Sequence, residues 1–421
     1  MSVFTRSRTT TVLGGIALVG ASALVLAGCT GGGGGTGGET SAPPTEERDL
    51  TLSIGTVLPQ TGALAFLGPP EEAGVGLAVA DINEAAKGIT VDVEFGDSGD
   101  PDNKAYETTV PRLLGNGVSA LIGAASSGVT KLFLDQAVSA GVVTFSPANT
   151  SPDFTTWDDN NLYWRTAPSD LLQGEVLGNL IAEDGHQTLG IIYLNDAYGT
   201  GLEAALTENF EAAGGEVVAS QAYNATDTTY DAQVSAVLAE NPDAIAVIGF
   251  VETSTIVPAV VADGFDGGNF YFVDGNTSQW GTDMPVPIEG SKGTQPGPAL
   301  EDDFVERLNG WWTGEGNEEL ADLNYAAESY DAVVLLALAA LVANSTEGAD
   351  LAANLQEVSG GSGDGEKCTS FEECADIILG GGTADYDGYS GAITFDEAGD
   401  PTEASIGIFE YGADNTHTRI N

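Results

Sequence analysis

The chain has 421 residues, of which 63 are acidic and 12 are basic, so its formal net charge at neutral pH is −51. Such an excess of negative charge repels phosphate backbones and anionic membrane surfaces, which excludes binding to nucleic acids. We expect most of the carboxylates to form a solvated coat and not a reactive site; adaptation to salty surroundings is a further reason for such a coat.

Residues 1–28 have the composition of a bacterial signal peptide. Arg6 and Arg8 form a basic start, and residues 12–26 are an apolar segment that is too short to span a bilayer as a mature anchor. The segment runs into Leu-Ala-Gly-Cys, which resembles the lipobox of bacterial lipoproteins. We therefore expect Cys29 to carry a lipid that anchors the protein to the outer face of the cell membrane. The alternative is an ordinary secretory signal with a chance cysteine.

Residues 29–49 are rich in Gly, Thr and Pro and show no apolar periodicity, which predicts a flexible tether. The roughly 370 residues that follow are more than a single hydrophobic core usually holds. We therefore expect two lobes.

Two further cysteines, Cys368 and Cys374, lie close together in the sequence. Outside the membrane such a pair is expected to be oxidised to a disulfide. A two-cysteine metal site is the alternative, but the two histidines, His186 and His417, do not neighbour the pair. We expect the disulfide, and no metal site.

Strands and helices alternate through the first part of the mature chain, as in a parallel sheet with crossover helices. The expected strands are 50–58, 89–95, 118–122, 142–145 and 162–166, and the expected helices are 71–86, 104–114 and 129–140.

The alternation restarts near residue 169, which predicts a second doubly wound unit. Its expected strands are 188–193, 216–222, 244–249 and 269–273, and its expected helices are 171–183, 202–213, 230–239 and 253–263. Helices at 300–310 and 324–344 and closing strands at 393–395 and 406–411 follow. Helix 324–344 is the most apolar of the mature chain, but Glu328 and Asp331 interrupt it, so we expect a buried helix and not a membrane span.

Two polar turns follow neighbouring strands of the first unit, at residues 123–128 and 146–152. The carboxyl ends of parallel strands share one edge of the sheet, where ligands usually bind. A helix that begins near Ser127 directs free N–H groups and the positive end of its dipole at this edge. The two hydroxyl-rich turns therefore suit a small carboxylate. The alternative is that Ser126, Ser127 and Thr150 only cap helices and turns.

Six segments, spread over nearly the whole mature chain, have a familiar order. They are IGTVLPQTGALAFLG (54–68), GVGLAVADINEAAKGI (74–89), FSPANTSPDFT (145–155), WRTAPSDLLQG (164–174), NDAYGTGL (195–202) and YDGYSGAITFDEAGDP (386–401). Together they resemble the type I solute-binding proteins of ABC importers, in particular the leucine/isoleucine/valine-binding branch. The resemblance is specific for the family and much less specific for the ligand.

This resemblance implies an α/β fold of two doubly wound, Rossmann-like lobes joined by a three-stranded hinge, the periplasmic binding protein type I fold. It places the hinge crossovers near Ser169, Pro296 and Gly388. The implied division is 50–168 with 297–388 for lobe I, and 169–296 with 389–421 for lobe II.

The resemblance also implies a site for an amino acid. Ser127, Thr150 and backbone groups of Ala148 would hold the α-carboxylate, Tyr198 would cover the ligand, and Asp274 would bind the α-ammonium. Neutral donors suit a carboxylate in a dry cleft, whereas an ammonium there needs a charged partner. The alternatives are that Asp274 is a turn-forming residue before Gly275 and that Tyr198 is a packing aromatic.

The side-chain end of the implied site differs from the family pattern. Ser126 belongs to the same polar turn as Ser127, and the Phe66/Leu67 region lies where an aromatic residue often lines the side-chain pocket. Phe250 stands where an aromatic residue with a hydroxyl often occurs, so one ligand hydrogen bond is lost. Together with the apolar loop at 65–70, this favours a hydrophobic ligand or a different small solute.

The resemblance implies a lipid-anchored receptor that closes around its solute and delivers it to an ABC permease in the membrane. A sensor of the same fold, which reports to a membrane signalling partner, is the second hypothesis. An enzyme is disfavoured, because residues 59–62 lack the GxGxxG pattern of dinucleotide-binding proteins and residues 123–128 lack the GxSxG spacing of hydrolases. No cofactor is expected.

Overall fold

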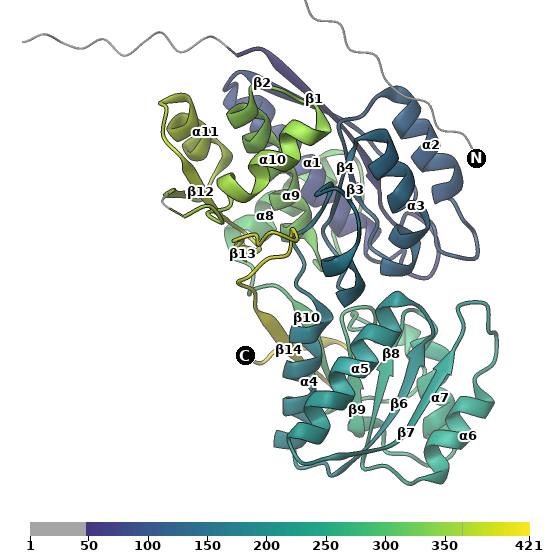
Figure 1. Ribbon diagram of the computed structural model, residues 1–421. Coiled ribbons are helices and arrows are strands. Elements are labelled where there is room, and N and C mark those ends of the chain that lie inside the picture. The colour runs from purple at the N-terminus through teal and green to yellow at the C-terminus, as the bar shows by residue number, and fades with distance from the viewer. Residues whose placement is uncertain (1–47, 364) are drawn as a thin grey trace, which may run out of the picture. The chain divides into compact units, whose positions relative to one another are not determined.

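Two β-sheets, each flanked by helices, form the core of the protein. The computed structural model describes residues 48–363 and 365–421 (Figure 1). Cys29 and the predicted signal peptide lie outside these residues. Figure 1 shows the first sheet in purple and blue, and the second in teal with the yellow strand β14 from the C-terminal end of the chain. The expected α/β class with two doubly wound units is therefore confirmed.

The first sheet consists of five parallel strands in the order β2-β1-β3-β4-β5. Its central strands are buried from end to end, as expected for a parallel sheet that is covered on both faces. The strands are β1 (Leu50–Val57), β2 (Ile89–Glu94), β3 (Ala120–Gly123), β4 (Val143–Ser146) and β5 (Tyr163–Arg165), and the helices between them are α1 (Gly68–Ala85), α2 (Tyr106–Asn116) and α3 (Ser127–Ala140).

The second sheet has seven strands in the order β15-β14-β10-β9-β8-β6-β7. Strands β6 to β10 run parallel, whereas β14 and β15 form an antiparallel edge. The strands are β6 (Thr188–Leu194), β7 (Glu216–Tyr223), β8 (Ala244–Ile248), β9 (Phe270–Phe272), β10 (Lys292–Pro296), β14 (Ile406–Tyr411) and β15 (His417–Arg419), and the helices are α4 (Asp170–Glu183), α5 (Ala197–Ala212), α6 (Asp231–Ala239) and α7 (Thr253–Ala262).

The remaining helices pack against the first sheet and against one another. They are α8 (Asp302–Gly314), α9 (Ala326–Ala343), α10 (Gly348–Val358) and α11 (Phe371–Leu379), with a small sheet of β11 (Glu366–Cys368), β12 (Ala384–Gly388) and β13 (Gly391–Ala392). Among the described helices α9 alone is long and apolar enough to cross a membrane, but 89% of it is buried within the protein. Its side chains join those of β1, β3 and β4 in one hydrophobic core, which confirms the predicted buried helix.

The predicted strand at 393–395 is wrong. Only Phe395 pairs, in an isolated bridge with Pro401. The reason is a tight turn that follows it, in which the Asp396 carboxylate accepts hydrogen bonds from the backbone N–H groups of Ala398 and Asp400. This turn folds the chain back before a ladder can form.

Three connections join the two sheets, and the first two turns of α9 contact two of them and the small sheet that leads to the third. The Thr166 hydroxyl, between β5 and α4, donates to the Glu328 carbonyl at 2.9 Å. Gly297, between β10 and α8, lies against the Glu328 side chain. Asp331 accepts hydrogen bonds from Tyr386 and from Ser390, at the end of the small sheet that leads to the third connection.

Cys368 and Cys374 form the predicted disulfide, with a sequence separation of 6 residues. It closes a small loop at the start of α11, where both cysteines are buried. Replacing both cysteines by serine is expected to lower the free energy of unfolding by about 2–2.5 kcal/mol, because the unfolded chain regains the freedom of the loop. Urea unfolding followed by circular dichroism measures this loss. The same midpoint for the variant and the oxidised protein would contradict it.

The acidic coat has few partners, because most of the basic side chains already pair with carboxylates. Lys87, for example, contacts both Glu372 and Asp376, and Lys131 contacts Asp153. Most acids therefore repel one another across the surface. We expect the thermal midpoint to rise by about 5 °C or more between 0.1 and 1 M KCl, because the Debye length falls from about 10 Å to about 3 Å. A midpoint that stays constant or falls with salt in differential scanning calorimetry would exclude this repulsion.

Candidate functional site

A small cavity lies among the loops that follow the strands of both sheets. Its lining comes from the segments after β1, β3, β4, β6, β8 and β9 and from the residue before α9, so it occupies the edge where parallel sheets bind ligands. The lining residues are Leu64, Leu67, Ala125, Ser126, Ser127, Ala148, Tyr198, Phe250, Asp274, Gly275 and Tyr325. The cavity measures about 10 Å³, which is about the room that one water needs. A larger solute therefore requires these groups to move.

The start of α3 forms one wall of the cavity. The Ser126 hydroxyl caps the helix by accepting a hydrogen bond from the Val129 N–H at 3.3 Å. The Ser127 hydroxyl accepts one from the Ser151 N–H at 3.3 Å, which ties the two polar turns together. Both serines are buried. Capping thus explains part of the role of Ser126, while the helix start still directs its free N–H groups at the cavity.

The Asp274 carboxylate forms the opposite wall and carries a dense set of hydrogen bonds. Tyr198 donates to it at 2.6 Å, Tyr325 at 2.5 Å and the Gln173 amide at 3.0 Å. Burial raises the pKa of Asp274 above its usual value. The three donors reduce this rise but do not reverse it. Asp274 is therefore not an exposed turn residue, and Tyr198 is more than a packing aromatic, although its ring also stacks on Phe250 at 5.5 Å.

Tyr198 reaches Asp274 because α5 begins earlier than the sequence pattern predicts. The expected start was residue 202, whereas the helix begins at Ala197. The Asp196 carboxylate caps it by accepting a hydrogen bond from the Gly199 N–H at 2.9 Å. This cap extends the helix by a turn and places Tyr198 in its first turn, facing the cavity.

A second buried acid, Asp170, lies beside this site. No described residue forms an ion pair with its carboxylate, and the hydroxyl of the neighbouring Thr150 is close enough to lower its pKa. The Asp170 N–H donates to the Thr150 carbonyl at 2.7 Å, which holds the two residues together. Burial raises the pKa of Asp170 well above its usual value, and the negative charge of Asp274 raises it further. Two neighbouring buried acids favour a cationic group between them.

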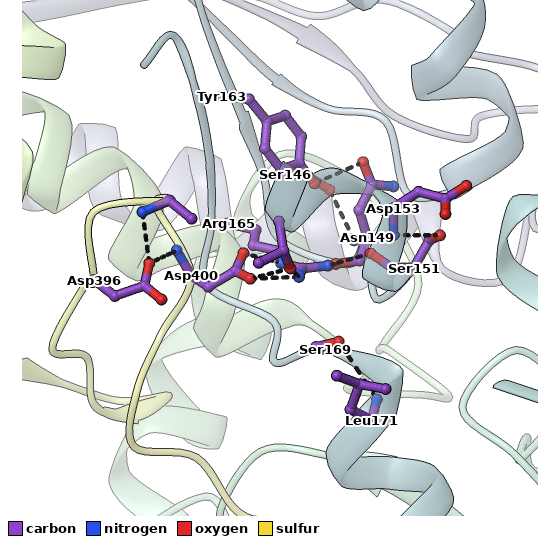
Figure 2. Close-up of polar contacts among 12 residues, drawn as sticks. Ser146, Asn149, Ser151, Asp153, Tyr163, Arg165, Ser169, Leu171, Asp396 and Asp400 are labelled. Atoms are coloured by element: carbon purple, nitrogen blue, oxygen red, sulfur yellow. Dashed lines mark hydrogen bonds and ion pairs between the residues drawn. The ribbon is translucent and has the colours of Figure 1, made fainter. Parts of the chain in front are cut away.

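Arg165 is fully buried and holds the loop that carries Thr150 (Figure 2). Its Nη1 donates to the carbonyls of Asn149 and Ser151 at 3.2 and 2.8 Å. Its Nε and Nη2 donate to the two carboxylate oxygens of Asp400 at 2.6 and 2.9 Å. Figure 2 shows Arg165 between Asp400 on one side and this loop on the other. The pair therefore fixes the backbone on both sides of Thr150.

The predicted ligand residues come together with one exception. Ser126, Ser127, Ala148, Tyr198, Phe250 and Asp274 line the cavity, and Thr150 lies buried beside Asp170. Phe66 does not line it, but faces a separate groove with Pro70 and Trp312. The reason is the turn before α1, in which the Leu67 N–H donates to the Leu64 carbonyl. Leu64 and Leu67 therefore face the cavity and Phe66 faces away from it.

Sequence reasoning missed Asp170, Gln173 and Tyr325 at the site. A signal was present for the first two, because both lie in the quoted segment 164–174 at the start of the second unit. Tyr325 comes from the far side of the chain, just before α9, and no local pattern connects it to Asp274. Within residues 48–363 and 365–421, no three side chains of His, Cys, Asp or Glu gather as metal ligands do.

A family model described as periplasmic binding protein matches residues 51–370, which is most of the chain. The chain belongs to the periplasmic binding protein family. This family consists of binding proteins and not of enzymes.

Two relatives within this family bear on the comparison. The chemotactic signal transduction system substrate-binding protein BasB of Halobacterium salinarum is 26% identical over 370 residues, 83% of this chain and 84% of that protein. A leucine-, isoleucine-, valine-, threonine- and alanine-binding protein of Pseudomonas aeruginosa is 29% identical over 189 residues, 44% of this chain and 50% of that protein.

Solved structures of periplasmic binding proteins share the fold. A leucine-binding protein of Thermotoga maritima superimposes with a TM-score of 0.72 at 20% identity, over 88% of this chain and 98% of that one. A branched-chain amino acid transporter substrate-binding protein of Streptococcus pneumoniae, solved with isoleucine, has a TM-score of 0.70 at 22% identity. The match covers 88% of this chain and 99% of that one. The type I fold implied by the sequence is thus confirmed.

Proposed function

We propose that this periplasmic binding protein serves an ABC importer, binds a branched-chain or other hydrophobic amino acid in the cavity and delivers it to the permease. The observation that carries the proposal is the division of the cavity walls. A helix start with neutral hydroxyls lies on one side and the carboxylate of Asp274 lies on the other, while the buried carboxylate of Asp170 lies beside the cavity, next to Thr150. The relative from Pseudomonas aeruginosa binds leucine, isoleucine, valine, threonine and alanine according to its name, which supports an amino acid as the ligand.

In this proposal each end of the amino acid has its own partners. The α-carboxylate lies at the start of α3, against Ser127 and the Thr150 loop. The α-ammonium lies against Asp274 and Asp170, where it replaces a tyrosine hydroxyl as the partner of a carboxylate oxygen. Leu64 and Phe250 offer apolar surface to the side chain. A charge-assisted contact to each acid then offsets the cost of burying the ammonium.

The mechanism is closure of two lobes about the three connections. We assign 50–168 with 297–388 to lobe I and 169–296 with 406–421 to lobe II, and we add residues 389–401 to lobe I because Phe395 and Asp400 pack against the first sheet. A ligand that contacts both lobes favours the closed form by its differential affinity, and the permease recognises that form. A lipid on Cys29 would keep the protein at the outer face of the membrane, next to the permease.

A sensor for a membrane signalling partner is the second candidate. It is favoured by one observation, the similarity to the chemotactic protein BasB over 84% of that protein. The two functions differ in what deletion of the gene abolishes. Loss of uptake of the bound solute supports the importer, whereas intact uptake with lost chemotaxis supports the sensor.

Isothermal titration of the purified protein with the twenty amino acids, urea and short amides tests the proposed ligand class. We expect saturable binding of at least one of leucine, isoleucine and valine, with little affinity for the corresponding amines and carboxylic acids that lack one end. Failure of every amino acid to bind would refute the proposal. Tighter binding of urea or an amide would show that the ligand belongs to that class of solute instead.

Binding of an ammonium ligand is expected to release protons. The pKa values of Asp170 and Asp274 are both raised in the free protein, and a nearby cation favours their ionised forms. Affinity should therefore increase with pH above about 4, where an ordinary Asp is already ionised, until both acids are ionised. Titrations in buffers of different ionisation enthalpy measure the release. Replacing Asp170 by asparagine should reduce it, and proton uptake on binding would contradict the assignment.

A further inference from the structure

A second and larger pocket lies at the connection from β10 to α8. It measures about 320 Å³ and is formed by this connection, α8, the segment before α9, and strands β14 and β15. Tyr325 lines both this pocket and the cavity described above. We refer to it as the connection pocket.

One wall of the connection pocket carries an acid without a partner. Glu328 is only 4% exposed, and it lines the pocket. Its carboxylate takes part in none of the ion pairs among the described residues, and a hydrogen bond from its own backbone N–H lowers its pKa slightly. Burial raises its pKa to about 8. A carboxyl group with this pKa is mostly protonated at neutral pH, and a cation bound beside it in the pocket would favour its ionised form.

The surroundings of Glu328 leave room for such a cation. Gly297 has φ +103°, and a Cβ at this position would lie 2.7 Å from Glu328 Oε1. A side chain here would therefore occupy the space beside the carboxylate that glycine leaves open. Arg419 also lines the pocket, but its guanidinium donates to the Gly297 carbonyl at 3.0 Å and lies over the Phe409 ring at 5.9 Å. It closes one end of the pocket without pairing with Glu328.

The rest of the lining indicates the kind of molecule that carries the cation. Leu300, Leu323 and Phe409 supply apolar surface, and Gln295 and Asn324 supply amides. Asp322 adds a second carboxylate, which accepts a hydrogen bond from Ser278 at 2.9 Å. An apolar wall next to an unpaired acid suits an amine with a short hydrocarbon body better than a hydrated metal ion.

We propose that the connection pocket is a binding site for small amphipathic amines, with the ammonium on Glu328 and the hydrocarbon body against Leu300 and Phe409. The site is separate from the cavity of the proposed function and does not depend on what that cavity binds. Tyr325, which donates to Asp274, lines both the connection pocket and the cavity and so lies between the two spaces.

Titration of the full mature protein with n-butylammonium tests this proposal, with 1-butanol and butyrate as uncharged and anionic counterparts. We expect saturable binding of n-butylammonium and none of the other two. Glu328→Gln should weaken that binding at least tenfold, since it removes the charge and keeps the shape. Ala299→Trp, an exposed wall position that leaves the core intact, should weaken it by a similar factor even if Glu328→Gln folds poorly.

Two further variants separate this site from the cavity. Glu240→Gln, on an exposed helix end, controls for loss of one surface charge and should leave n-butylammonium binding unchanged. Asp274→Asn should leave it unchanged as well. The proposal is overturned if no saturable binding occurs, if neither Glu328→Gln nor Ala299→Trp weakens it, or if Asp274→Asn abolishes it, because the amine would then occupy the cavity.

Discussion

Replacing Arg165 by methionine is expected to lower the free energy of unfolding by about 3–5 kcal/mol, because Asp400 is then left as a buried charge without its partner. The loss should be large for one side chain, since Arg165 is fully buried and donates to both carboxylate oxygens of Asp400 and to the backbone around Thr150. Urea unfolding followed by circular dichroism measures the change.

Two controls show whether the buried charge is the cause. Lys131→Met breaks the contact between Lys131 and Asp153, which are 29% and 55% exposed. This change should lower the free energy of unfolding by less than about 1 kcal/mol. The double variant Arg165→Met with Asp400→Leu should recover much of the stability, because no charge remains buried. It should not recover ligand affinity, since the carbonyls of the Thr150 loop still lack their donor. A single variant as stable as the Lys131 variant would show that Arg165 is dispensable for the fold.

Replacing Asp274 by asparagine is expected to weaken binding of the amino acid by about 100-fold or more. The variant keeps the shape of the side chain, but the ligand's ammonium loses a charged partner in a buried site, which typically costs about 2–5 kcal/mol. Titration of the preferred amino acid against wild type and variant gives the ratio of dissociation constants. Asp263→Asn, on the exposed end of α7, is the matched control and should bind as wild type does.

Although Asp274→Asn is expected to weaken ligand binding, we do not expect it to lower the stability of the ligand-free protein. The wild-type carboxylate is buried and raises the pKa of Asp170 by its charge, so a neutral asparagine removes a repulsion. We therefore expect the ligand-free variant to be at least as stable as wild type at neutral pH.

For ligand binding, a variant whose dissociation constant is within threefold of wild type would show that Asp274 is not the partner of the ammonium.

Most elements of the fold were predictable because they depend on local patterns. The strands β6 and β8 are continuous apolar runs, and the ends of α2 and α3 coincide with Gly117 and Gly141, whose φ values are +79° and +72°. The expected strand at 393–395 failed because its apolar residues belong to a hydrophobic core without entering a ladder. A short apolar run is typical both of a buried loop and of a strand, so the sequence pattern alone does not distinguish them at residues 393–395.

The candidate site was predictable only in part, and the distance along the chain explains the difference. Ser127, Ala148 and Asp274 follow directly after strands, so the topology alone places them at one edge. Tyr325 meets Asp274 across 51 residues, and Gln173 meets it across 101. Such partners follow from the packing of whole lobes, which no local pattern encodes. Phe66 failed for the opposite reason, since a single local turn decides which of three neighbouring apolar residues faces inward.

The contact between Arg165 and Asp400 spans 235 residues, and this separation affects the order in which the protein can assemble. The first sheet and its hydroxyl-rich turns are complete in the chain by residue 165, yet the counter-ion that neutralises their buried guanidinium lies close to the carboxyl terminus. Long-range contacts of this kind form late, because the chain loses the entropy of closing the loop before the contact can stabilise it. The Thr150 loop is therefore expected to become rigid only after the last connection has returned to the first sheet, so that a nascent chain shorter than about 400 residues carries an immature site.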